Sequence, residues 1–108
     1  FDLAGHVAES AAGYYLASLT GLDIAHSPEH GGNPEVDFVI TIGERRIPVE
    51  IKYRKVIDRI RDTFGLRLFM EKAANNAAFG LLITRDDEAK VDDPRIICIP
   101  LKSLFLVR

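Results

Sequence analysis

Residues 34–54 read PEVDFVITIGERRIPVEIKYR and contain two runs of alternating apolar residues, which Gly43 and Glu44 separate. Alternation with a period of two is typical of half-buried strands, so we predict strands at residues 36–42 and 47–53. Glycine at the first position of a two-residue turn suits a type II′ hairpin. The stretch therefore predicts a β-hairpin.

The two faces of this hairpin differ in chemistry, because successive side chains on a strand point to opposite faces. With a two-residue turn, the expected pairs on the apolar face are Val36 with Ile51, Phe38 with Val49, and Ile40 with Ile47. On the other face Asp37 lies across from Glu50, and Lys52 lies diagonal to it. A four-residue turn instead places Asp37 across from Lys52. Either turn gathers the three charged side chains on one face.

The facing acids raise an electrostatic problem. Carboxylates whose Cβ atoms are about 5 Å apart repel at neutral pH, so Asp37 and Glu50 need a compensating charge. Lys52 alone can supply it, which gives a surface network of charged side chains. A divalent cation is the alternative, because Mg²⁺ binds one or two carboxylates together with waters and substrate phosphate.

A further acid comes from the first predicted helix, residues 3–19. Glu9 shares a helix face with Ala12, Gly13 and Leu16, which are small or apolar. A carboxylate in such a stripe either lies at the edge of the core or points toward a cation.

The remaining patterns complete the order of elements. Residues 79–84 are typical of a strand buried on both faces, and residues 95–99 predict another strand. The order helix, strand, strand, helix, strand, strand predicts a mixed central sheet flanked by helices, in the α/β or α+β class. Asp62 can cap the second helix. The apolar stripe of that helix is Leu66, Phe69, Met70, Ala73, Ala74 and Ala77.

Length and composition predict one globular domain spanning residues 1–108. The chain is 47% hydrophobic and 28% charged, which is ordinary for a soluble protein. Because no apolar run approaches about 18 to 20 residues, we expect no membrane span. The single Cys98 excludes an internal disulfide and suits the cytoplasm, and we interpret it as a packed structural thiol.

Charge argues against a general polyanion binder, because the net charge is −2 at pH 7. Residues 44–67 differ, with eight basic and four acidic side chains. This segment is either an ordinary solvated surface or a basic flank beside a phosphate site.

Residues 26–30, HSPEH, match the H-x-x-E-H pattern of some zinc proteases. That site needs both histidines on one helix face, whereas Pro28, Gly31 and Gly32 predict an irregular loop. We therefore interpret this stretch as a loop.

The acids of the helix and hairpin also carry a resemblance. Glu9, followed by PEVDFVI and VEIKYR, resembles the PD-(D/E)XK nuclease superfamily, with Asp37, Glu50 and Lys52 at its Asp…Glu-x-Lys positions. The chain departs from the pattern at the proline, because Pro34 lies three residues before Asp37.

The resemblance extends over nearly the whole chain. The segments AGHVAES, PEVDFVI, IPVEIKYR, GLLIT and IPLKSLFL are similar to the domain found C-terminal to the ATPase module in many prokaryotic AAA-type ATPases. This similarity implies a restriction-endonuclease-like α-β-β-β-α-β core, in which residues 23–26 supply the strand that the patterns above lack. Because the chain begins at Phe1 without methionine, we expect it to come from a longer chain, and the resemblance implies an ATPase module in that chain.

The resemblance further implies a Mg²⁺- or Mn²⁺-dependent phosphodiesterase that acts on DNA. Asp37, Glu50 and the Ile51 carbonyl would hold the metal, and Glu9 would bind it directly or through water. Lys52 would position or deprotonate the attacking water.

Three arginines are the expected contacts to DNA phosphates, without reading sequence. They are Arg45, Arg46 and Arg54.

Two other classes of function stay open. The acidic net charge and the displaced Pro34 suit a catalytically inactive module that binds nucleic acid or a partner protein and regulates an attached ATPase. Exposure of Phe105, Leu106 and Val107 would instead suit an oligomerisation domain, such as a homodimer.

Overall fold

The hairpin predicted from the alternating sequence forms as β2 (Phe38–Ile42) and β3 (Arg45–Lys52). Gly43 has a φ of +62°, which the first position of a type II′ turn requires and which side chains other than glycine rarely adopt. The predicted register is confirmed within the strands. The observed pairs include Phe38 with Val49, Ile40 with Ile47, and Ile42 with Arg45.

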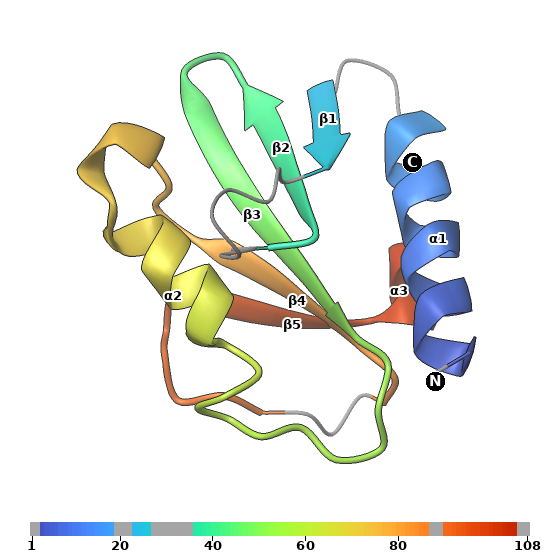
Figure 1. Ribbon diagram of the computed structural model, residues 1–108. Coiled ribbons are helices and arrows are strands. Elements are labelled where there is room, and N and C mark those ends of the chain that lie inside the picture. The colour runs from blue at the N-terminus through green and yellow to red at the C-terminus, as the bar shows by residue number, and fades with distance from the viewer. Residues whose placement is uncertain (1–2, 19–22, 27–35, 87–89, 106–108) are drawn as a thin grey trace.

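The computed structural model describes residues 3–18, 23–26, 36–86 and 90–105. Figure 1 shows their arrangement. The further elements are α1 (Leu3–Ser18), β1 (Asp23–His26), α2 (Phe64–Glu71), the 3₁₀ helix η1 (Ala73–Asn75), β4 (Gly80–Thr84), β5 (Ile96–Pro100) and α3 (Leu101–Leu104). This order contains the expected α-β-β-β-α-β core, and β1 lies where the missing strand was predicted.

The strands of the described residues form one five-stranded sheet in the order β1-β2-β3-β4-β5. β1, β2 and β3 pair antiparallel, whereas β4 and β5 run parallel to β3. The predicted mixed sheet is therefore confirmed, and β3 joins its antiparallel and parallel halves. β4 lies between two parallel neighbours and is largely buried, as its continuous apolar sequence predicts.

The helices divide between the two faces of the sheet (Figure 1). The core on the α1 and α3 side consists of Ala8, Ala12, Phe38, Ile40, Val49, Ile51, Ile83 and Leu104. The core on the α2 side consists of Val36, Leu66, Phe69, Met70, Leu82 and Ile96. The predicted pairing of Val36 with Ile51 is wrong, because β2 begins only at Phe38 and the bend at Asp37 turns Val36 toward α2.

α2 ends earlier than the apolar spacing predicts. Its buried side chains end at Met70, whereas Ala73 and Ala74 of the predicted stripe are exposed. The side-chain amide of Asn75 donates a hydrogen bond to the Phe69 carbonyl at 2.9 Å. Asparagine favours such local bonds to the backbone over a continued helix, which explains the early end.

The prediction that Asp62 caps α2 is also wrong. Thr63 occupies the N-cap position, and its hydroxyl donates to the carbonyl of Arg59 at 2.7 Å. Asp62 is buried, and its carboxylate accepts hydrogen bonds from the guanidinium of Arg54 and the backbone N–H of Asp58, each at 2.9 Å. A buried carboxylate is stable only when it is paired in this way.

Cys98 is half-buried against the core on the α2 side, and burial raises the pKa of its thiol. This environment agrees with a packed structural thiol. The loop predicted at residues 26–30 is wrong at His26, which is the last residue of β1 and pairs with Phe38. The rest of that loop and the apolar residues Leu106 and Val107 lie outside the described residues. Within the described ranges, no helix is long and apolar enough to cross a membrane.

We predict that Gly13→Ala destabilises the fold. A Cβ atom at Gly13 would lie 2.6 Å from Cζ of Phe38, whose side chain is buried in the core under α1. The loss in the free energy of unfolding should be about 1–3 kcal/mol, because a close-packed core accommodates added atoms poorly. Urea denaturation measures it.

Ser10→Ala is the control, because Ser10 is exposed on the same helix. It should change the free energy of unfolding by less than about 0.5 kcal/mol. A Gly13→Ala variant as stable as the wild type would contradict the close approach of α1 to β2.

Candidate metal centre

Asp37 lies at the end of the hairpin ladder, immediately before β2. Its backbone N–H donates to the Val49 carbonyl at 3.1 Å. Its carboxylate oxygen Oδ2 accepts a hydrogen bond from the backbone N–H of Ile51 at 2.8 Å. Asp37 therefore binds backbone groups on both sides of Glu50, which fixes the position of its carboxylate next to that residue.

Glu50 lies on the α2 face of β3, and its side chain is only 12% exposed. Burial, a side-chain hydrogen bond with Asp37 and the negative charge of Asp37 raise the pKa of Glu50 to about 9. The raised pKa favours a proton on Glu50 at neutral pH, in the hydrogen bond between the two carboxyl groups. A proton held there relieves the repulsion that the sequence predicts.

Lys52 lies two residues after Glu50 on the same face of β3. Its Nζ atom is 3.8 Å from Oε1 of Glu50, and its side chain is 26% exposed. The positive charge opposes the rise in the pKa of Glu50 but does not outweigh burial and Asp37. The distance exceeds that of a hydrogen bond, so Lys52 acts on the pair as a nearby charge.

Glu9 reaches the same neighbourhood from α1. Its side chain is half-buried, and its negative charge is among the causes that raise the pKa of Glu50. The helix thus brings a third acid near the hairpin pair. In the part of the chain that the structure describes, however, no group of three or more His, Cys, Asp or Glu side chains is arranged to hold a metal ion.

The donor set at the pair still fits a hard divalent cation. Asp37 and Glu50 present two carboxyl groups in direct contact, and Mg²⁺ in proteins often takes only one or two carboxylates, with water and substrate filling its other positions. Ile51 directly follows Glu50 on β3, and its carbonyl oxygen would be a further oxygen ligand. A cation bound at this pair would displace the proton between the two carboxyl groups.

The family description "Domain of unknown function (DUF4143)" matches residues 5–104, which is nearly the whole sequence. The chain belongs to the DUF4143 family. No curated protein and no solved structure matches it. The matched region of this DUF4143 domain contains Glu9, Asp37, Glu50 and Lys52.

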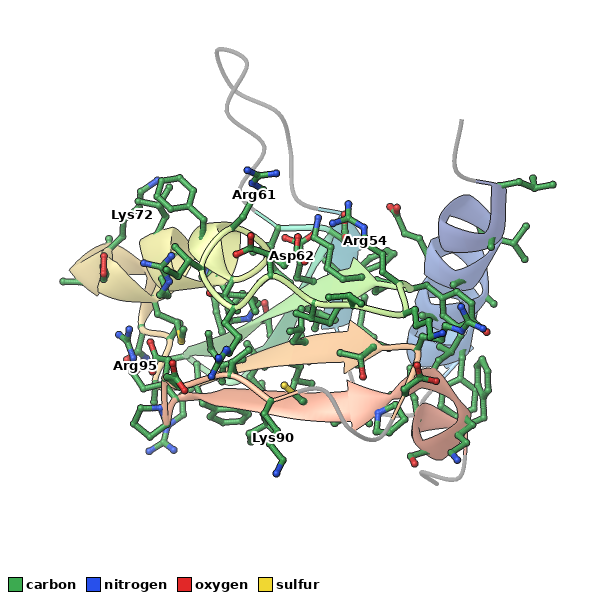
Figure 2. All side chains as sticks on the ribbon, turned by 90° about the horizontal axis from the view of Figure 1, so that it is seen from below. Arg54, Arg61, Asp62, Lys72, Lys90 and Arg95 are labelled. Atoms are coloured by element: carbon green, nitrogen blue, oxygen red, sulfur yellow. The ribbon has the colours of Figure 1, made fainter. Side chains whose placement is uncertain are left out.

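The three arginines predicted to contact phosphate do not all lie near Glu50 in this DUF4143 domain. Arg45 and Arg46 are exposed beside the hairpin turn, roughly 13 to 17 Å from Glu50 along β3. Arg54 follows Lys52 closely, and Figure 2 shows it near Asp62, its ion-pair partner at 2.9 Å. The structure therefore pairs Arg54 with Asp62 and places Arg45 and Arg46 at the other end of β3 from Glu50.

Sequence reasoning missed Asp62 as an anchor of the segment that follows β3. The pattern contains a signal for this role, because Asp58 and Asp62 alternate with basic residues and aspartate readily binds nearby backbone N–H groups. The Oδ1 atom of Asp58 accepts from the N–H groups of Ile60 and Arg61. These bonds lower the pKa of Asp58.

We predict that Glu50 makes the metal-free domain less stable as the pH rises. Between the ordinary value of 4.5 and the folded pKa of about 9, the folded state keeps the proton and the unfolded state loses it. The free energy of unfolding should therefore fall across this window, by at most about 1.4 kcal/mol per pH unit. Urea denaturation in EDTA at several pH values measures the slope.

Glu50→Gln should flatten this slope, because glutamine retains the shape of the side chain and does not titrate. Glu44→Gln, at an exposed position beside the turn, is the matched control and should leave the slope unchanged. Equal slopes in the wild type and Glu50→Gln would show that Glu50 does not hold the proton.

Proposed function

We propose that this domain is a Mg²⁺- or Mn²⁺-dependent phosphodiesterase that cleaves DNA. The observation that carries the proposal is the half-buried, hydrogen-bonded pair of Asp37 and Glu50, with Nζ of Lys52 3.8 Å from Oε1 of Glu50. A divalent cation can replace the proton at such a pair, because metal binding competes with protons for carboxylates. The α-β-β-β-α-β order and the Asp37…Glu50-x-Lys52 spacing support a place in the PD-(D/E)XK nuclease superfamily.

Each residue then has a definite role. Asp37 and Glu50, with the Ile51 carbonyl, hold the metal, and Glu9 contacts it directly or through a water molecule. When bound, the metal polarises a phosphoryl oxygen and lowers the pKa of the attacking water. Lys52 orients or deprotonates that water and offsets negative charge that develops on the phosphate.

The wider setting is also part of the proposal. The resemblance to domains that follow the ATPase module of AAA-type proteins supports an ATPase in the same chain or complex. The free Cys98 suits the reducing cytoplasm. Phe105 is 42% exposed beside Tyr15, which supports a contact with a second copy of the domain.

The second candidate function is a catalytically inactive module that binds nucleic acid or a partner protein and regulates the ATPase. Leu3 and Val7 lie one turn apart on α1 and are 61% and 56% exposed, so they present an apolar strip to a partner. The shared proton of Glu50 also stabilises the carboxyl pair without any metal. In this case the pair is structural.

We predict that Mn²⁺ binding releases a proton from the domain near neutral pH. Binding requires Glu50 to ionise, so the apparent affinity should rise with pH toward about 9. Calorimetry in two buffers with different ionisation enthalpies measures the released proton. Asp37→Asn should weaken binding at least about tenfold, because it removes the carboxylate charge while keeping an acceptor for the Ile51 N–H.

Glu44→Gln is the control for this loss of charge and should bind Mn²⁺ like the wild type. Equal affinity for Mn²⁺ in Asp37→Asn and the wild type would show that the carboxyl pair is not the metal site. The absence of binding altogether would favour the structural role of the pair.

We predict metal-dependent cleavage of linear or branched DNA, visible on denaturing gels with Mg²⁺ or Mn²⁺ and absent in EDTA. Lys52→Ala should lower the rate at least about 100-fold, the usual effect of losing a proton-transfer group. Lys72→Ala is the matched control, since Lys72 is exposed and directly follows the last residue of α2, Glu71. An unchanged cleavage rate in Lys52→Ala would contradict the catalytic role of Lys52.

A further inference from the structure

A cavity of about 400 Å³ lies between the segment that follows β3 and the segment that follows β4. β3 and β4 are parallel, with Lys52 paired to Thr84, so the cavity lies beyond their carboxyl ends. Ligands of open α/β sheets bind at this edge, because loops from neighbouring parallel strands meet there. The volume also falls within the range of small-molecule sites.

Basic side chains predominate in the lining. Asp86 is the acid among the described lining residues, and Val56 and Ile57 supply apolar surface. Residues 87–89 lie outside the described part of the chain. The basic lining residues are Arg54, Lys55, Arg59 and Lys90.

Ion pairs hold two of these basic residues in place. Arg54 binds the buried Asp62 at 2.9 Å, and Asp62 also accepts from the N–H of Asp58. Arg59 binds Asp92 at 3.3 Å, which links the segment after β3 to the segment after β4. One exposed ion pair therefore bridges the two segments that form the walls of the cavity.

Besides these ion pairs, the described lining has the two positive charges of Lys55 and Lys90 and the negative charge of Asp86. Neither Lys55 nor Lys90 forms an ion pair or hydrogen bond with another residue that the structure describes, and both are exposed. Figure 2 shows Lys90 extending outward from its segment, away from Arg54. A lysine has a long flexible stem, so its ammonium group can turn toward an anion that enters the cavity.

We propose that this cavity binds a phosphate group, carried either by a free nucleotide or by a nucleic-acid strand. Lys55 and Lys90 neutralise the phosphate, while Arg54 and Arg59 shape the walls. The apolar contribution of Val56 and Ile57 suits the sugar or base attached to it. Phosphate binding needs neither a metal nor cleavage, so the inference stands independently of the proposed nuclease activity.

The test is a binding titration in EDTA with four probes: inorganic phosphate, a deoxynucleoside monophosphate, and a short DNA strand with or without a 5′-phosphate. We expect the wild type to bind at least one of them. Lys55→Ala combined with Lys90→Ala should weaken binding at least tenfold. A preference for the monophosphate or for the 5′-phosphorylated strand identifies the source of the phosphate.

Two control variants separate the outcomes. The first is the double variant Lys72→Ala with Lys102→Ala, which loses the same two positive charges at exposed positions outside the cavity lining. It should leave binding unchanged. Asp37→Asn should also bind phosphate normally in EDTA, so its loss of cleavage reports on the proposed metal site alone. No binding of any probe, or an equal loss in the Lys72 and Lys102 double variant, would overturn the phosphate site.

Discussion

The hydrogen bond between Asp37 and Glu50 is the interaction on which the rest of the site depends. Two carboxyl groups lie together at a largely buried position, where a second unpaired charge is strongly unfavourable. Lys52, at 3.8 Å, is too far away to neutralise Glu50 by a direct hydrogen bond. A proton in this hydrogen bond relieves the repulsion, and the bond from the Ile51 N–H holds the Asp37 carboxylate in place beside Glu50.

β3 connects this pair to the rest of the molecule. It pairs antiparallel with β2, which sets Asp37 beside Glu50, and parallel with β4, which directs both following segments to one edge of the sheet. The strand thus leads from the carboxyl pair to the basic cavity within a few residues. A metal-dependent chemistry and a phosphate contact are compatible in this arrangement, because the acids are buried on the sheet and the basic side chains lie beyond its end.

Several features of the fold were missed because they depend on competition between local signals. Asp62 has the sequence context of a helix cap. Its carboxylate instead forms an ion pair with Arg54, within the segment that follows β3. Asn75 interrupts an apolar spacing that would otherwise continue α2. Arg45 and Arg46 are close to Glu50 in sequence, but an extended strand separates residues by about 3.3 Å each, so they lie at the other end of the hairpin.

The sequence by itself determined the hairpin, its register and the shared face of Asp37, Glu50 and Lys52, because alternation and a glycine turn act over a few residues. It also indicated the order of elements and the strand at β1. Only the tertiary structure decided that the pKa of Glu50 is raised, since the rise depends on burial and on the contact with Asp37. The cavity likewise arises from two segments about 30 residues apart, which meet only because β3 and β4 are parallel neighbours.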